Sequence, residues 1–206
     1  MVYHIAGGQW DHSVDVKDEH SWIEVLQGDI QNIELVDPTP DEGGLITRTG
    51  WTVGRPMKTE GMPTKVARKG VGLQVKPLLD VENFFGQFLV NDTVKDIIEA
   101  LEPGVHQFFP MELYVDGELQ RIDYFFNICN RLDTMDGEKT FPLNARGFWK
   151  PKKGEPSALV FSTAKIGDHH AWRDKFKTGA FISDRLADAM QAAEVTGLSY
   201  QHWPQA

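Results

Sequence analysis

The chain has 206 residues, and its 30 acidic side chains outnumber its 21 basic ones, giving a formal net charge of −9. One cysteine and the lack of an apolar run near the roughly 18 residues of a membrane span exclude a disulfide framework and a membrane helix. The start carries no signal-peptide pattern and the lone thiol suits a reducing compartment, so we expect a cytoplasmic protein with a conventional core.

The first part of the chain predicts an irregular lobe. A stretch rich in proline and glycine runs from about residue 37 to 64, and the part before it is too short to fold by itself. Residues 72–79 then predict a strand or a buried connection. We therefore expect residues 1–79 to form an N-terminal lobe packed on a main domain of residues 80–206.

Two amphipathic helices are predicted, over about residues 91–101 and 183–194. Asn91 or Asp92 can cap the first and Ser183 the second, and apolar residues repeat in both at the spacing of one helical face. The two segments also resemble each other at an offset of 92 residues, with a short apolar segment before each. This similarity fits either an internal pseudo-repeat or a common solution to one packing problem.

The remaining elements are strands. Apolar runs at 108–115 and 119–130 flank Asp116-Gly117, which predicts a hairpin, and further strands are expected at 158–163 and 198–203. The fold class is therefore α+β: a mixed or antiparallel sheet with a central Asp-Gly hairpin, packed by the two capped helices and the irregular lobe.

Charge is unevenly spread along the chain. Residues 11–42 hold ten acids and one base, residues 43–79 seven bases and one acid, and residues 80–142 thirteen acids and four bases. Acidic surfaces repel nucleic acid and speed encounter with basic proteins, although simple solvation gives the same pattern.

Motifs for common chemistries are missing from the sequence. It has no glycine-rich phosphate loop, His-Glu-x-x-His helix, Cys-x-x-Cys pair or Gly-x-Ser-x-Gly elbow, so no cofactor is expected. Cys129 lies inside an apolar strand and is interpreted as a buried, inert thiol.

Residues 168–174 are the strongest candidate for catalytic chemistry. His169 and His170 lie next to Asp168, with Asp174 close behind, as a base or a metal site would require. Adjacent helical residues point about 100° apart, however, so the two imidazoles would not converge. The alternative is a loop and a short helix capped by Asp168, with Trp172 in the core.

A second polar group follows the hairpin. Loops that carry function often gather such residues, but an arginine with nearby aspartates can equally satisfy the backbone of a tight turn. The group consists of Asn127, Asn130, Arg131, Asp133 and Asp136.

Several segments between about residues 80 and 203 resemble, in order, an immunity-protein family of bacterial polymorphic toxin systems that was formerly a domain of unknown function. The segments are residues 84–91, 103–110, 127–133, 181–186 and 196–198. The resemblance implies a protein that binds a cognate secreted toxin in the producer's cytoplasm, within contact-dependent competition, and that has no catalytic residues. The surplus of acid suits a basic toxin.

Tryptophans among acidic residues are the expected contacts with the toxin, because aromatic anchors hold and charges steer. The predicted partner-binding residues are Trp10, Asp11, Asp15, Asp18, Glu19 and Trp22, followed by Asp168, His169 and Trp172. A tryptophan in the core is the alternative in each case.

Two other functions stay open at this point. One is a hydrolase or transferase that uses His169 or His170 with Asp168 or Asp174. The other is a nucleic-acid adaptor that uses the basic stretch around Trp51, which the net acidic charge disfavours.

Overall fold

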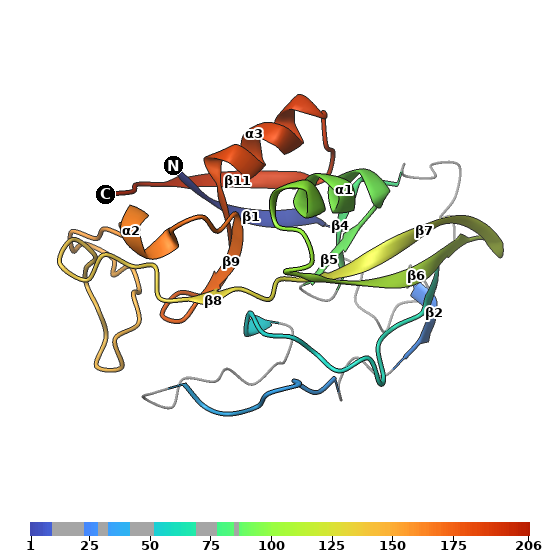
Figure 1. The fold of residues 1–206 in the computed structure, drawn as a ribbon, viewed down its shortest axis with the longest axis horizontal. Coiled ribbons are helices and arrows are strands. Elements are labelled where there is room, and N and C mark those ends of the chain that lie inside the picture. The colour runs from blue at the N-terminus through green and yellow to red at the C-terminus, as the bar shows by residue number, and fades with distance from the viewer. Residues whose placement is uncertain (10–22, 29–32, 42–51, 69–77, 85–86) are drawn as a thin grey trace.

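The fold is built on one large sheet, seen in the computed structural model of the chain (Figure 1). The structure describes all residues except 10–22, 29–32, 42–51, 69–77 and 85–86. The elements in chain order are β1 (Val2–Gln9), β2 (Ile23–Gln27), β3 (Lys65–Arg68), β4 (Val81–Phe84), β5 (Gln87–Val90), α1 (Asp92–Leu101), β6 (Gln107–Val115), β7 (Glu118–Asn127), β8 (Arg131–Leu132), α2 (Thr163–Ile166), β9 (Ala171–Asp174), β10 (Ala180–Ser183), α3 (Asp184–Ala192) and β11 (Leu198–Trp203).

The described strands form a mixed sheet. Their order is β2-β3-β6-β7-β5-β4-β1-β10-β9-β8, and β11 also pairs with β1. The pairs β1–β4, β3–β6 and β8–β9 are parallel, and the other pairings in the described part are antiparallel. Together with the helices, this sheet confirms the predicted α+β class.

Both long helices begin at the predicted caps. The Asn91 side chain accepts a hydrogen bond from the Val94 backbone N–H at 3.1 Å, and the Ser183 hydroxyl accepts one from Leu186 N–H at 3.2 Å. These bonds satisfy backbone donors that have no partner in the first turn of a helix. The two helix predictions are confirmed.

The two capped helices belong to units of the same topology. Helix α1 connects β5 to β6, which both pair antiparallel with β7, and α3 connects β10 to β11, which both pair antiparallel with β1. Each unit is thus two parallel strands with a third strand between them, and its helix packs on that middle strand. The similarity seen at an offset of 92 residues extends to this arrangement.

The hairpin of β6 and β7 turns through two residues. Val115 pairs with Glu118, so only Asp116 and Gly117 connect the strands, with φ angles of 50° and 82°. Left-handed backbone at both positions matches the right-handed twist of a two-residue hairpin, and Asp-Gly adopts it readily.

Alternation along the strands buries both faces of the sheet. In β7, Phe126 packs in the core cluster under α1 and α3, whereas Phe125 packs in a second cluster on the opposite face. Residues 33–66 supply Ile33, Val53 and Met57 to this second cluster. In Figure 1 the two helices lie above the sheet, and the described residues of this part of the chain lie below it.

A third core cluster lies on the far half of the sheet. Phe181 and Trp172 point away from the helices and pack against Phe161 and Trp149, which come from the long segment between β8 and β9. Long irregular segments therefore cover the face of the sheet opposite the helices.

Some elements differ from the predictions. Residues 158–163 form only isolated bridges at Ala158 and Phe161, because the chain there covers the sheet and does not extend it. The alternative of a short helix capped by Asp168 is wrong, because residues 171–174 form β9, whose side chains alternate between two clusters. The predicted element at 72–79 falls mostly outside the described residues.

The first strand is part of the main sheet. β1 pairs with β4, β10 and β11, all from the region after residue 79. The sequence pattern placed these residues in the irregular lobe, because eight residues with three glycine or alanine positions give little strand signal. The division at residue 79 stays a prediction.

Replacing Asn91 tests the cap of α1. We expect Asn91→Ala to lower the free energy of unfolding by about 1 kcal/mol or somewhat more, because Val94 N–H loses its acceptor and the Asp80 carboxylate loses one of its donors. Asn91→Ser keeps a capping oxygen and should lose clearly less in urea denaturation. Equal losses in the two variants would contradict the capping role.

Candidate functional site

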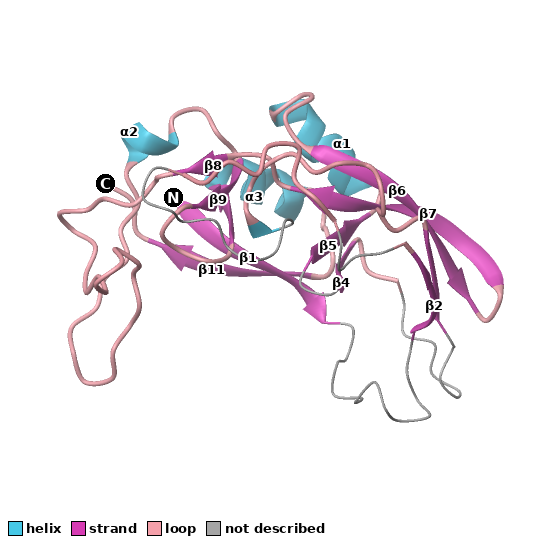
Figure 2. Ribbon diagram, turned by 90° about the horizontal axis from the view of Figure 1, so that it is seen from below, coloured by secondary structure: helices cyan, strands magenta, loops and turns pink. Residues whose placement is uncertain are grey.

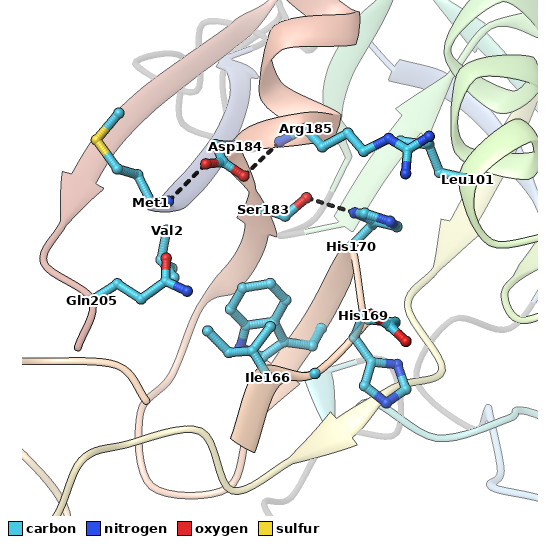
Figure 3. A pocket seen from close by; sticks show the side chains of 13 residues that line it. Met1, Val2, Leu101, Ile166, His169, His170, Ser183, Asp184, Arg185 and Gln205 are labelled. Atoms are coloured by element: carbon cyan, nitrogen blue, oxygen red, sulfur yellow. Dashed lines mark hydrogen bonds and ion pairs between the residues drawn. The ribbon is translucent and has the colours of Figure 1, made fainter. Parts of the chain in front are cut away.

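A cavity of about 500 Å³ lies where the start of α3 meets the loop between α2 and β9. Figure 3 shows its lining, to which both termini of the chain, the loop and α3 contribute. The residues relevant to chemistry are Asp168, His169, His170, Ser183, Asp184 and Arg185.

The predicted residues of this region are partly brought together here. Asp168 is exposed and His169 half-buried at the cavity, so both can be reached from solvent. Trp172 is fully buried, and its indole N–H donates to the Thr134 hydroxyl at 3.1 Å. The core alternative therefore describes Trp172, which has no surface to offer a partner.

The two imidazoles point apart, as Figure 3 shows. His170 Nδ1 lies 2.8 Å from the Ser183 hydroxyl, and His169 Nδ1 lies 3.6 Å from Glu102 Oε1. The same hydroxyl caps α3, so it already serves the fold. Among the described residues no three His, Cys, Asp or Glu side chains are placed to hold a metal ion.

Asp174 has a structural role at the last position of β9. Its carboxylate accepts hydrogen bonds from the Thr134 backbone N–H and hydroxyl at 2.8 and 2.6 Å, and from the N–H groups of Phe176 and Lys177. Burial raises the pKa of Asp174, although these bonds oppose the rise. The carboxylate thus fixes the turns around β9 and does not line the cavity.

Behind the loop lies a buried network that sequence analysis did not find. Glu102, at the end of α1, accepts hydrogen bonds from the Asn130 amide, His106 Nε2 and the Ala171 backbone N–H at 2.8, 2.9 and 2.8 Å. His106 Nδ1 accepts from the Cys129 N–H at 3.1 Å, so its ring proton lies on Nε2. One carboxylate therefore joins α1, the exit of β7 and β9.

Burial and hydrogen bonding act in opposite directions on Glu102. Burial alone would raise the pKa of its carboxyl, but hydrogen bonds from His106 and from backbone N–H groups hold the pKa below its usual value. The group is therefore ionised when the chain is folded. The spacing of Glu102 and His106 across a Pro-Gly turn was the signal available in the sequence, but it does not show that Asn130 comes close.

The polar residues after the hairpin also serve the fold. The Asn127 amide donates to the Arg55 carbonyl and to the Gln107 side chain, both at 2.9 Å. Arg131 Nε donates to Asp41 at 2.8 Å, which holds the pKa of Asp41 low. These bonds tie the segments of Asp41 and Arg55 to the sheet and favour the structural alternative.

Two further side chains have unusual surroundings. Burial raises the pKa of Cys129 to about 11, so the thiol stays protonated, as predicted for an inert cysteine. Burial lowers the pKa of Arg173 to about 10, and Nε and Nη2 find no acceptor within the described part of the chain. Arg173 does not line the cavity, and it has no part in the function proposed below.

The other predicted contacts, Trp10, Asp11, Asp15, Asp18, Glu19 and Trp22, lie outside the described residues. Within the described residues, no helix is long and apolar enough to cross a membrane.

Comparison with known proteins adds a family. The model of the immunity protein family (Imm11) matches residues 47–204, more than three quarters of the chain. Comparison with curated proteins gives no match.

Substitution of Glu102 tests the buried network. Glu102→Gln puts an amide N–H₂ among three donors, so we expect the free energy of unfolding at pH 7 to fall by about 1–3 kcal/mol. The pKa of Glu102 is lower in the folded chain than in the unfolded chain. The stabilisation by its charge is therefore complete at pH values above the pKa of an unfolded glutamate, about 4.3, and is lost as the pH falls through the pKa of Glu102 in the folded chain.

The difference between wild type and Glu102→Gln should therefore narrow below about pH 4 in urea titrations. Glu138→Gln is the control, because Glu138 is exposed on a turn. A difference that stays constant from pH 7 to the acid limb would contradict the role assigned to the charge.

Proposed function

Because the chain belongs to an immunity protein family, we propose that it binds one cognate bacterial toxin and neutralises it as a stoichiometric complex. The family match is the observation that carries this proposal. In it, the protein acts in the cytoplasm of the cell that produces the toxin, covers the toxin's active site or blocks its activation, and converts no substrate of its own.

The contacts of the candidate catalytic groups support binding over catalysis. His170 pairs with the capping hydroxyl of α3, and Asp174 is saturated by hydrogen bonds from its own turns. A hydrolase or transferase would need these groups to face a common substrate. Their engagement in the fold leaves that alternative without a supporting observation.

Two regions are proposed for the toxin contact. The first is the cluster of Trp10, Asp11, Asp15, Asp18, Glu19 and Trp22, chosen from the sequence. The second is the rim of the cavity, where Asp168 and His169 are accessible. The first fits a partner with a basic surface, since opposite charge speeds encounter.

Co-expression tests the proposal. The toxin domain encoded beside this gene should stop growth when produced alone, and growth should return when this protein is produced with it. The purified pair should elute as one complex, and His170→Ala should protect as well as wild type. Loss of protection in a folded His170→Ala protein, or no complex between the pair, would contradict the proposal.

Charge reversal tests the N-terminal cluster. Asp11→Lys, Asp15→Lys and Asp18→Lys together should slow association with that toxin domain about tenfold or more at low salt, with a smaller effect at high salt, because steering is screened by ions. Stopped-flow mixing measures the rate, and circular dichroism checks the fold. Unchanged association at low salt would remove this cluster from the interface.

A further inference from the structure

The outer half of the β6–β7 hairpin presents a sheet face that no described element covers. The register pairs Pro110 with Tyr124, Glu112 with Ile122, and Tyr114 with Leu119 across a bulge. Residues paired across two strands point to the same side of the sheet. These six side chains, called the hairpin face below, therefore share one surface.

The hairpin face continues the buried face under α1. Phe108 and Phe126, the preceding pair on the same side, stack at 5.0 Å and belong to the helix-side core. Toward the hairpin turn α1 no longer covers the sheet, and Leu119 and Ile122 are 51% and 49% exposed. Figure 2 shows the hairpin reaching well past α1.

Acidic groups lie on and around the hairpin face. The Tyr124 hydroxyl donates to Asp92 at 2.9 Å, and the Tyr114 hydroxyl donates to Glu112 at 3.1 Å. Asp96 adds a charge that acts on Tyr124. The turn contributes Asp116.

Two lysines are the bases of this surface in the described part of the chain. Lys65 Nζ lies 3.9 Å from the centre of the Tyr114 ring, and Lys95 Nζ lies 5.4 Å from that of Tyr124. Among the described residues, the four carboxylates of Asp92, Asp96, Glu112 and Asp116 outnumber these two ammonium groups. The hairpin face thus has the composition of a protein–protein interface, with aromatic and aliphatic side chains at the centre and charged groups around them.

We propose that the hairpin face is a docking surface for the cationic face of the toxin. The inference rests on the function proposed above and adds a surface to it. Lysine and arginine side chains of the toxin would pair with the carboxylates, and their aliphatic stems or a neighbouring apolar residue would cover Ile122 and Leu119. A standard interface takes about 800 Å² from each partner, so the hairpin face would form its centre.

Paired substitutions test the docking surface against the toxin domain encoded beside this gene. Leu119→Ala with Ile122→Ala should weaken binding about tenfold or more, mainly through faster dissociation. Asp96→Lys with Glu112→Lys should slow association by a similar factor at low salt.

The matched controls are Leu143→Ala and Glu138→Lys. Leu143 is 43% exposed and Glu138 is exposed, and both belong to the segment after β8, at the opposite end of the molecule from the hairpin turn (Figure 1). Neither control should change affinity or rates. Circular dichroism and urea denaturation establish that all variants are folded.

The outcomes separate the two proposals. If wild type binds and protects but both hairpin variants bind as wild type does, the docking surface is wrong and the proposed function stands. If wild type itself neither binds nor protects, the proposed function fails and the docking surface with it. Weaker binding in the hairpin variants together with unchanged controls supports the surface.

Discussion

Both faces of the central sheet are apolar, and the need to cover them organises the rest of the molecule. Strand residues alternate between faces, so Phe125 and Phe126 cannot share one core. Two helices cover one part of the sheet, and two long irregular segments cover the opposite face. The described residues of 33–41 and 52–64 cover the second cluster, and residues 133–170 cover the third.

The buried Glu102 carboxylate fixes how one helix layer meets the sheet. It accepts hydrogen bonds from nearby His106 and from Asn130 and Ala171, which are distant in sequence, so its charge is compensated without an arginine or lysine. Burying a charge is costly unless hydrogen bonds replace water, and here backbone and amide donors do so. The loop of His169 and His170 is attached to the same carboxylate, which ties its position to the fold.

The helices and the hairpin strands were predicted because each has a signal in its own stretch of sequence. Asn91 and Ser183 cap apolar stripes, and Asp-Gly between apolar runs marks the hairpin, all within a few residues of chain. β9 was missed because its four residues read equally well as helix and are decided by pairing with β8 and β10. The same holds for β1, whose place depends on strands more than 70 residues away.

The site was harder to predict than the fold. Spacing alone showed that two adjacent imidazoles would not converge, but it did not show which partners they would take. The hairpin face on β6 and β7 could not be predicted from the sequence, because apolar and polar residues alternate in the same way along strands that are covered and strands that are exposed. Whether this part of the sheet is covered depends on how far α1 extends along the hairpin.

Taken as an immunity protein, the chain offers an acidic surface and buried polar groups that serve stability. It is proposed to inhibit the toxin by binding it in a fixed ratio, so the amount of protein needed to inhibit the toxin fully is the decisive quantity. Toxin activity titrated with increasing amounts of this protein should fall linearly and vanish at a fixed stoichiometric ratio. Complete loss of toxin activity at a small fraction of an equivalent, increasing with time, would show turnover and contradict the account.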